Sequence, residues 1–79
     1  MVLKNRIKIR APYKGKSSYS FWNNLGPGDI VEVEYSIKVH WGREKPWIKF
    51  TNTNNGLVFG CGSGKAANYI DKLEYSELD

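Results

Sequence analysis

The sequence has one cysteine and one histidine, Cys61 and His40. A lone cysteine cannot form an internal disulfide, and a cysteine-based metal site needs further ligands that the chain lacks. We therefore expect no metal, no cofactor and no enzymatic activity. His40 occupies a polar position of a predicted strand and has no second catalytic group at a recognisable spacing, so we expect it at the surface.

Long apolar runs are also absent. Lys4 and Arg6 follow closely on the first residues, which excludes the apolar segment of a signal peptide, and no later run reaches the length of a membrane span. We therefore expect a cytoplasmic protein with no membrane among its partners.

The 79 residues leave room for a single domain, 1–79. Hydrophobic residues make up 41% of the chain and charged residues 25%, which is the composition of a folded domain and argues against disorder. A chain of this size buries only about 60% of the surface that its unfolded form exposes, so the core must be thin. Because a thin core gains stability from a second subunit, a homodimer is one of the assemblies we consider.

Alternation of apolar and polar residues predicts most of the secondary structure. The longest such run, from Asp29 to Trp41, has period two throughout and indicates a strand that bends or is shared between two sides of a barrel. An Asn-Asn-Gly sequence predicts a tight turn between two later strands, and a loop is expected over Gly42–Pro46. The predicted strands are Leu3–Ala11, an aromatic strand beginning at Tyr19, Phe21 and Trp22, Asp29–Trp41, Trp47–Thr53 and Leu57–Cys61.

Helical spacing replaces the alternation near the end of the sequence. Apolar residues recur there at the period of a helix, Ser63 can cap its first turn, and the segment is expected to continue to about Leu78. The expected fold class is therefore mainly β, as a small five-stranded antiparallel curved sheet or an SH3-like or OB-like barrel with one C-terminal helix.

The segment from Gly60 to Ala66 is rich in glycine and resembles a phosphate-binding loop, but it fails the pattern. Phe59 stands where that loop needs a glycine, and Ala66 stands where it needs a hydroxyl for magnesium. Two alternatives remain. Backbone amides and Lys65 can hold a single anion, or the glycines serve only the tight turn from strand to helix.

Positive charge is concentrated in the first twenty residues, which carry six basic side chains and no acidic one. Such a patch can follow a nucleic-acid backbone while tyrosines stack on the bases, with Trp22 as a further aromatic. Glu32 and Glu34 lie on the polar face of their strand, so pairing of the two strands would neutralise much of this charge. The candidate residues for nucleic acid or another anion are Arg6, Lys8, Arg10, Tyr13, Lys14, Lys16, Tyr19 and Lys65.

Tryptophan and arginine are the residues most enriched at protein-interface hot spots, and both occur around the loop after the long strand. Trp41 shares its parity with Val39, which we expect to be buried, so plain packing is the alternative for at least one tryptophan. The candidate residues for a protein partner are Trp22, Trp41, Arg43, Lys45 and Trp47.

The stretch from Ile7 to Ile37 contains Ile-Lys-Ile-Arg-Ala-Pro-Tyr-Lys-Gly-Lys and then Phe-Trp-Asn-Asn-Leu-Gly-Pro-Gly-Asp-Ile-Val-Glu-Val. It resembles small early, host-takeover proteins of bacteriophages of low-GC Gram-positive hosts. The resemblance implies an inhibitor in the host cytoplasm that binds a replication or transcription protein, such as the DNA sliding clamp or RNA polymerase. The net charge of +4 departs from an acidic DNA mimic.

Two functions follow as hypotheses. The first is a non-enzymatic binding module that inhibits or modulates such a host protein. The second is a single-stranded DNA- or RNA-binding protein that uses the basic N-terminal strand and its aromatic residues. Salt separates the two, since phosphate contacts weaken steeply with ionic strength and aromatic protein contacts do so much less.

Overall fold

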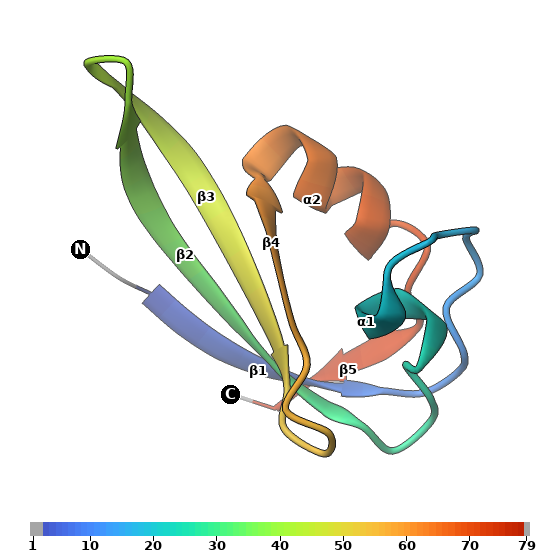
Figure 1. Cartoon of the computed structure of the whole chain (residues 1–79). Coiled ribbons are helices and arrows are strands. Elements are labelled where there is room, and N and C mark those ends of the chain that lie inside the picture. The colour runs from blue at the N-terminus through green and yellow to red at the C-terminus, as the bar shows by residue number, and fades with distance from the viewer. Residues whose placement is uncertain (1–2, 79) are drawn as a thin grey trace.

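The computed structural model describes residues 3–78, which form one open, curved antiparallel sheet with two helices on one of its faces (Figure 1). The sheet order is β4-β3-β2-β1-β5. This confirms the predicted five-stranded curved sheet with a helix toward the C-terminus. The strands are β1 (Leu3–Ile9), β2 (Ile30–His40), β3 (Arg43–Asn52), β4 (Val58–Gly62) and β5 (Tyr75–Glu77), and the helices are α1 (Ser20–Asn23) and α2 (Ser63–Ile70).

The loop predicted over Gly42–Pro46 is wrong, because β3 begins at Arg43 directly after a two-residue turn. Pro46 lies opposite Ile37, one position away from a hydrogen-bonded pair, so its missing N–H costs no ladder hydrogen bond. The alternation of β2 therefore continues through the turn into β3.

The predicted aromatic strand is also wrong. Residues 20–23 form the short helix α1, in which the N–H of Asn24 donates to the carbonyl of Ser20 over 3.0 Å. Phe21, Trp22 and Leu25 are buried, and this spacing of one and four positions places them on one side of a helical turn. Helical burial of these aromatic side chains outweighs their preference for strands.

The C-terminal helix is shorter than predicted. α2 ends at Ile70, Ser63 makes no capping hydrogen bond, and the chain returns as β5 along β1. The N–H of Leu73 donates to the carbonyl of Ile70 over 3.0 Å, a tighter turn that ends the helix and buries Leu73 in the core. Glu74 and Glu77, which the predicted helix would have included, therefore lie beyond the end of α2.

The core lies between the helices and one face of the sheet. Its largest fully buried side chains include Trp22 of α1, Phe50 of β3 and Val31 of β2. The rings of Trp22 and Tyr69 stack with centroids 4.6 Å apart, so α1 and α2 meet over the sheet. The opposite face of the sheet has no helix over it among the described residues (Figure 1).

Asp29 connects two turns at the end of the sheet where β2 begins and β3 ends, here called the wide end. Its carboxylate accepts hydrogen bonds from the backbone N–H of Gly26 (2.9 Å), from Asn52 Nδ2 (3.0 Å) and from Asn54 Nδ2 (2.7 Å). Burial raises the pKa of Asp29, but these three hydrogen bonds outweigh it and hold the pKa below its usual value. Asn52 is fully buried, so this carboxylate also satisfies a polar group in the core.

Candidate interaction surfaces

A two-stranded arm projects from the sheet (Figure 1). Among the described residues, β1 pairs with β2 only as far as Tyr35, and β4 pairs with β3 only from Trp47. Residues 36–46, here called the arm, are therefore flanked on neither side. Trp47 lies at the base of the arm, opposite Ser36.

The tip of the arm is a two-residue turn of Trp41 and Gly42. Both residues have positive φ, 54° for Trp41 and 73° for Gly42, as a type I′ hairpin turn requires. This turn favours asparagine, aspartate or glycine, because a side chain in the left-handed region meets the following carbonyl at a cost of about 1–2 kcal/mol. Trp41 is nevertheless 90% exposed, so little packing within the chain offsets this cost.

The two faces of the arm differ in chemistry. Ile37 and Val39 continue the apolar face of the core out into solvent, and Val39 is 72% exposed. Its predicted burial, and the shared burial expected for Trp41, are therefore wrong. Parity assigned Val39 to the face of the sheet that carries the core, but along the arm no helix or third strand of residues 3–78 covers that face.

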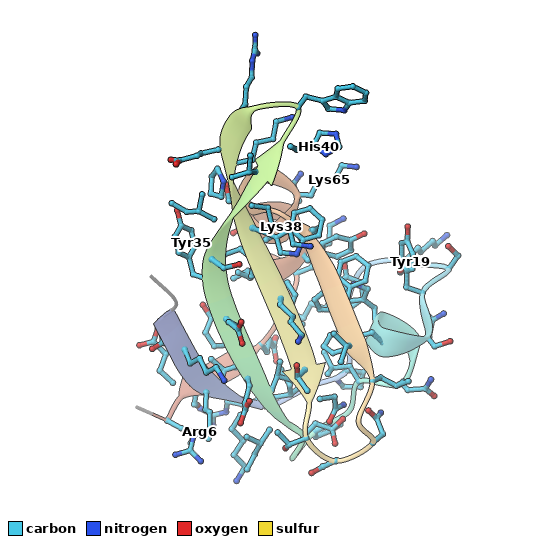
Figure 2. The ribbon with its side chains drawn as sticks, turned by 60° about the vertical axis from the view of Figure 1, so that its left-hand side comes forward. Arg6, Tyr19, Tyr35, Lys38, His40 and Lys65 are labelled. Atoms are coloured by element: carbon cyan, nitrogen blue, oxygen red, sulfur yellow. The ribbon has the colours of Figure 1, made fainter. Side chains whose placement is uncertain are left out.

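The other face of the arm is basic. Lys38 lies directly opposite Lys45, and His40 lies opposite Arg43, so basic side chains meet across the ladder. Lys38 Nζ lies 4.3 Å from the ring centroid of Trp47, so the charge of Lys38 is partly stabilised by a cation–π contact. Figure 2 shows Lys38 and His40 on the arm, away from Arg6 at the opposite end of the sheet.

Of the predicted partner-binding residues, the arm and its base bring together Trp41, Arg43, Lys45 and Trp47. Trp22 does not belong with them. It is 1% exposed and packs among Phe50, Phe59 and Tyr69, so its predicted contact with a partner is wrong. The physical reason is its place on α1, which turns the indole into the core.

The basic N-terminal strand is paired with acidic residues, as predicted from Glu32 and Glu34. Lys4 Nζ lies 3.6 Å from a carboxylate oxygen of Glu34, and Arg6 stands opposite Glu32 in the register. On the other side, the Arg10 guanidinium donates to the Ser76 hydroxyl over 3.2 Å. Two of the basic residues of this strand, Lys4 and Arg6, therefore each face a carboxylate of β2.

The loop after β1 also makes charged and aromatic contacts within the chain. Lys14 forms an ion pair and hydrogen bond with Glu74, which lowers the pKa of that carboxyl, and Arg10 adds to the effect. The ring of Tyr13 lies 5.0 Å from that of Trp22, and burial raises the pKa of its phenol. Tyr13 is thus a packing residue, and its ring offers no open platform for a base.

Three of the exposed lysines predicted to bind an anion line hollows in the surface. Lys8 lines a shallow hollow beside Gly28 and Ser76. Lys16 and Lys65 line another hollow together with Lys72. Lys8 and Lys16, which the sequence placed in one basic patch, therefore line separate hollows, and Lys16 lies instead beside Lys65.

The glycine-rich segment does join a strand to a helix, as predicted from its sequence. Gly62 precedes α2 and Lys65 lies in its first turn, with Cys61 buried beneath. Burial raises the pKa of the Cys61 thiol, although Lys65 partly opposes this, so the thiol is not activated as a nucleophile.

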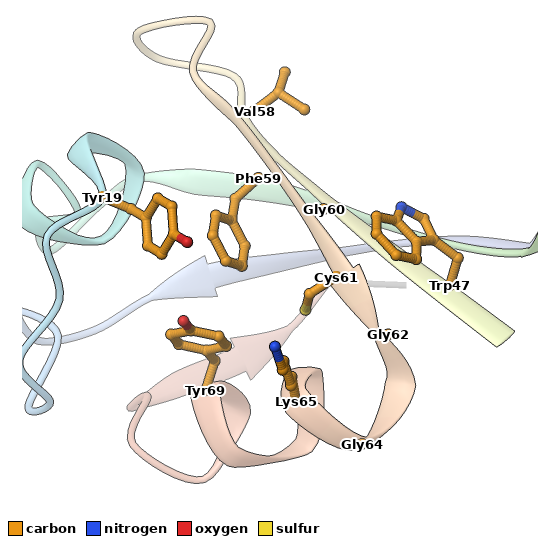
Figure 3. A pocket seen from close by; sticks show the side chains of 10 residues that line it. All are labelled: Tyr19, Trp47, Val58, Phe59, Gly60, Cys61, Gly62, Gly64, Lys65 and Tyr69. Atoms are coloured by element: carbon orange, nitrogen blue, oxygen red, sulfur yellow. The ribbon is translucent and has the colours of Figure 1, made fainter. Parts of the chain in front are cut away.

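A hollow of about 700 Å³ beside β4 was not predicted. Tyr19, Phe59 and Tyr69 line one part of it, and Trp47 lines another across Gly60 (Figure 3). No local motif marks this site, because its residues come from the segment before α1, from three consecutive elements and from opposite faces of a strand. The sequence offered only the aromatic residues themselves as a signal for this hollow, because Tyr19, Phe59 and Tyr69 lie far apart along the chain.

Searches of protein-family models, of curated proteins and of solved structures found no match to this chain. Within residues 3–78, no helix is long and apolar enough to cross a membrane. The same residues contain no group of three or more His, Cys, Asp or Glu side chains placed to hold a metal ion.

Proposed function

We propose that this protein is a non-enzymatic binding module that contacts a protein partner through the tip of its arm. The observation that carries the proposal is Trp41, which is 90% exposed and has a φ of 54° in a turn where asparagine or glycine fits better. Strained backbone geometry of this kind clusters at functional sites. In this reading Trp41 is the anchor of the contact.

The surroundings of Trp41 indicate the chemistry of the partner. The apolar face of the arm offers Ile37 and Val39, and the basic face offers Arg43 and Lys45. A protein surface with an apolar recess for the indole and acidic groups around it would complement both faces.

The resemblance of residues 7–37 to early phage proteins suggests where to look for this partner. It makes replication and transcription proteins of a bacterial host the first candidates, with the sliding clamp and RNA polymerase among them. Inhibition or modulation of such a protein is part of the proposal.

Nucleic-acid binding is the second candidate, and one observation favours it in a new place. Lys38, Lys45 and Arg43 concentrate positive charge on one face of the arm, where phosphates would neutralise it. On the N-terminal strand, by contrast, Lys4 and Arg6 each face a carboxylate of β2. The second candidate is therefore moved from that strand to the arm.

Affinity capture from bacterial lysate tests both candidates. The bait proteins are the wild type, Trp41→Asn, which suits the turn, and Trp41→Phe, which keeps an aromatic anchor. The first proposal expects one protein that is captured by the wild type and by Trp41→Phe, survives nuclease and moderate salt, and is lost with Trp41→Asn. Purified partner and bait must then bind directly with the same ranking.

Other results contradict the first proposal. Capture that disappears with nuclease, or that falls steeply with salt and depends on Lys38 and Lys45, would favour nucleic acid. Capture that is unchanged in Trp41→Asn would remove Trp41 as the anchor.

A further inference from the structure

β4 leaves an edge of the sheet open. It is the last strand on its side, and no strand of residues 3–78 pairs with its outer edge. Its sequence, Val-Phe-Gly-Cys-Gly, contains none of the charged or proline residues by which proteins usually protect such edges. The opposite edge, β5, has only three residues and includes Glu77.

The register shows which backbone groups face outward. The N–H of Asn52 donates to the carbonyl of Leu57 over 2.9 Å, so this is a hydrogen-bonded position of the β3–β4 ladder. Alternation along an antiparallel pair then makes Phe59 the next bonded residue of β4. The N–H and C=O groups of Val58 and Gly60 therefore point away from β3, and Val58 is 51% exposed.

Side-chain recesses lie on both faces of this edge. Phe59 has its ring centroid 4.8 Å from that of Tyr19 and 5.1 Å from that of Tyr69, and these rings line the hollow on one face. Trp47 covers the other face so closely that a Cβ on Gly60 would lie 2.9 Å from its Nε1 (Figure 3). An added strand would place successive side chains alternately against these two aromatic surfaces.

The charge beside the edge is positive. Lys65 lines the hollow and also lines its neighbour together with Lys16 and Lys72, and no acidic residue lines either one among the described residues. A second copy of the chain that presented its own β4 would bring further lysines to this site. Acidic side chains complement it instead.

From these observations we propose that β4 binds an extended, acidic peptide segment of a partner protein by strand addition. The backbone of Val58 and Gly60 supplies hydrogen bonds, the aromatic hollow receives apolar side chains, and Lys65 faces a carboxylate. This surface is separate from the tip of the arm and does not depend on the function proposed for Trp41.

A test uses the whole protein and synthetic ten-residue peptides in which valine or tyrosine alternates with glutamate. A matched set carries lysine in place of glutamate. We expect the acidic peptides to bind about tenfold or more tightly than the lysine set, with weaker binding in Lys65→Gln. In the wild type, binding must slow hydrogen exchange of the Val58 and Gly60 amides, a readout that needs no variant.

Val58→Pro is the decisive variant, with Val58→Thr as its matched control. The outward N–H of Val58 makes no ladder hydrogen bond, so proline should leave the sheet intact while blocking an added strand. Peptide affinity is expected to fall about tenfold or more in Val58→Pro and to change little in Val58→Thr or Trp41→Asn. Unprotected Val58 and Gly60 amides, equal binding of both peptide sets, or edge-to-edge dimers in sedimentation would each overturn the proposal.

Discussion

The two ends of β2 have the same alternating sequence but opposite surroundings. Val31, at the wide end of the sheet, is 2% exposed, whereas Val39, on the arm, is 72% exposed. Both point to the same face. At the wide end β1, β3 and the helices surround that face, whereas along the arm β3 is the only strand of residues 3–78 that pairs with β2. Alternation therefore determines to which face of the sheet a side chain points, and the neighbouring elements determine how far that side chain is buried.

The difference between core and arm is sharpest for two tryptophans. Trp22→Ala removes a large side chain that is 1% exposed and should destabilise the protein by about 3–5 kcal/mol. Trp41→Ala removes one that is 90% exposed and should change stability by less than about 0.5 kcal/mol. Urea unfolding of both variants measures this contrast. A large loss in Trp41→Ala would mean that the arm packs against the body of the protein.

Asp29 should matter to the wide end of the sheet and not to the arm. In Asp29→Asn an NH2 group replaces one carboxylate oxygen and faces the N–H donors of Gly26, Asn52 and Asn54. The substitution should lower the free energy of unfolding by about 1–3 kcal/mol near neutral pH. Because the pKa of Asp29 is lowered by folding, its contribution is present above the unfolded value of 3.8 and is lost as the pH falls through the folded pKa.

Urea unfolding of the wild type and of Asp29→Asn at several pH values checks this prediction. The difference in stability should be constant near neutral pH and should shrink in acid, where Asp29 of the wild type becomes protonated. Other carboxylates titrate in both proteins and largely cancel. A difference that does not depend on pH would show that the charge of Asp29 is not what holds the two turns.

A small gain in stability is expected at the tip of the arm, opposite in sign to the losses at Trp22 and Asp29. Trp41→Asn should stabilise the arm by about 0.5–1 kcal/mol, since asparagine tolerates the left-handed conformation that tryptophan adopts there. Slower hydrogen exchange of the arm amides in Trp41→Asn than in Trp41→Phe would verify this. Faster exchange would mean that the indole stabilises the turn through contacts that exceed its strain.

The sequence predicted those elements whose signal is local. The alternation of β2 was sufficient, because period two is a property of a short segment. The Asn-Asn-Gly turn also forms, but with positive φ at Gly56 and not at Asn55, and four residues, 53–56, separate the hydrogen-bonded Asn52 and Leu57. The two-residue turn at Trp41 and Gly42 was missed although alternation continues on both sides of it. Pro46 is tolerated within β3 because its nitrogen faces away from β2, and no strand of residues 3–78 pairs with that edge of the arm.

The remaining errors arose where tertiary contacts decide. Phe21 and Trp22 have strand propensity but are held in a helix by the core. Tyr75 to Glu77 form a strand only because β1 offers them a free edge. Among the predicted contact residues, the sequence could group Trp41 with Arg43 and Lys45, but it could not separate the buried Trp22 from them.

The pairing of β1 with β5 has a consequence for how the protein is assembled. β2, β3 and β4 follow one another as a meander of local contacts, which can form early. By contrast, Ile7 pairs with Glu77, so nearly all of the described chain separates the two partners. β5 must leave the ribosome before it can pair with the free edge of β1. Until β5 pairs, the nascent sheet has two open edges, β4 and β1. We expect the chain to be most prone to aggregation in the interval between synthesis of β4 and docking of β5.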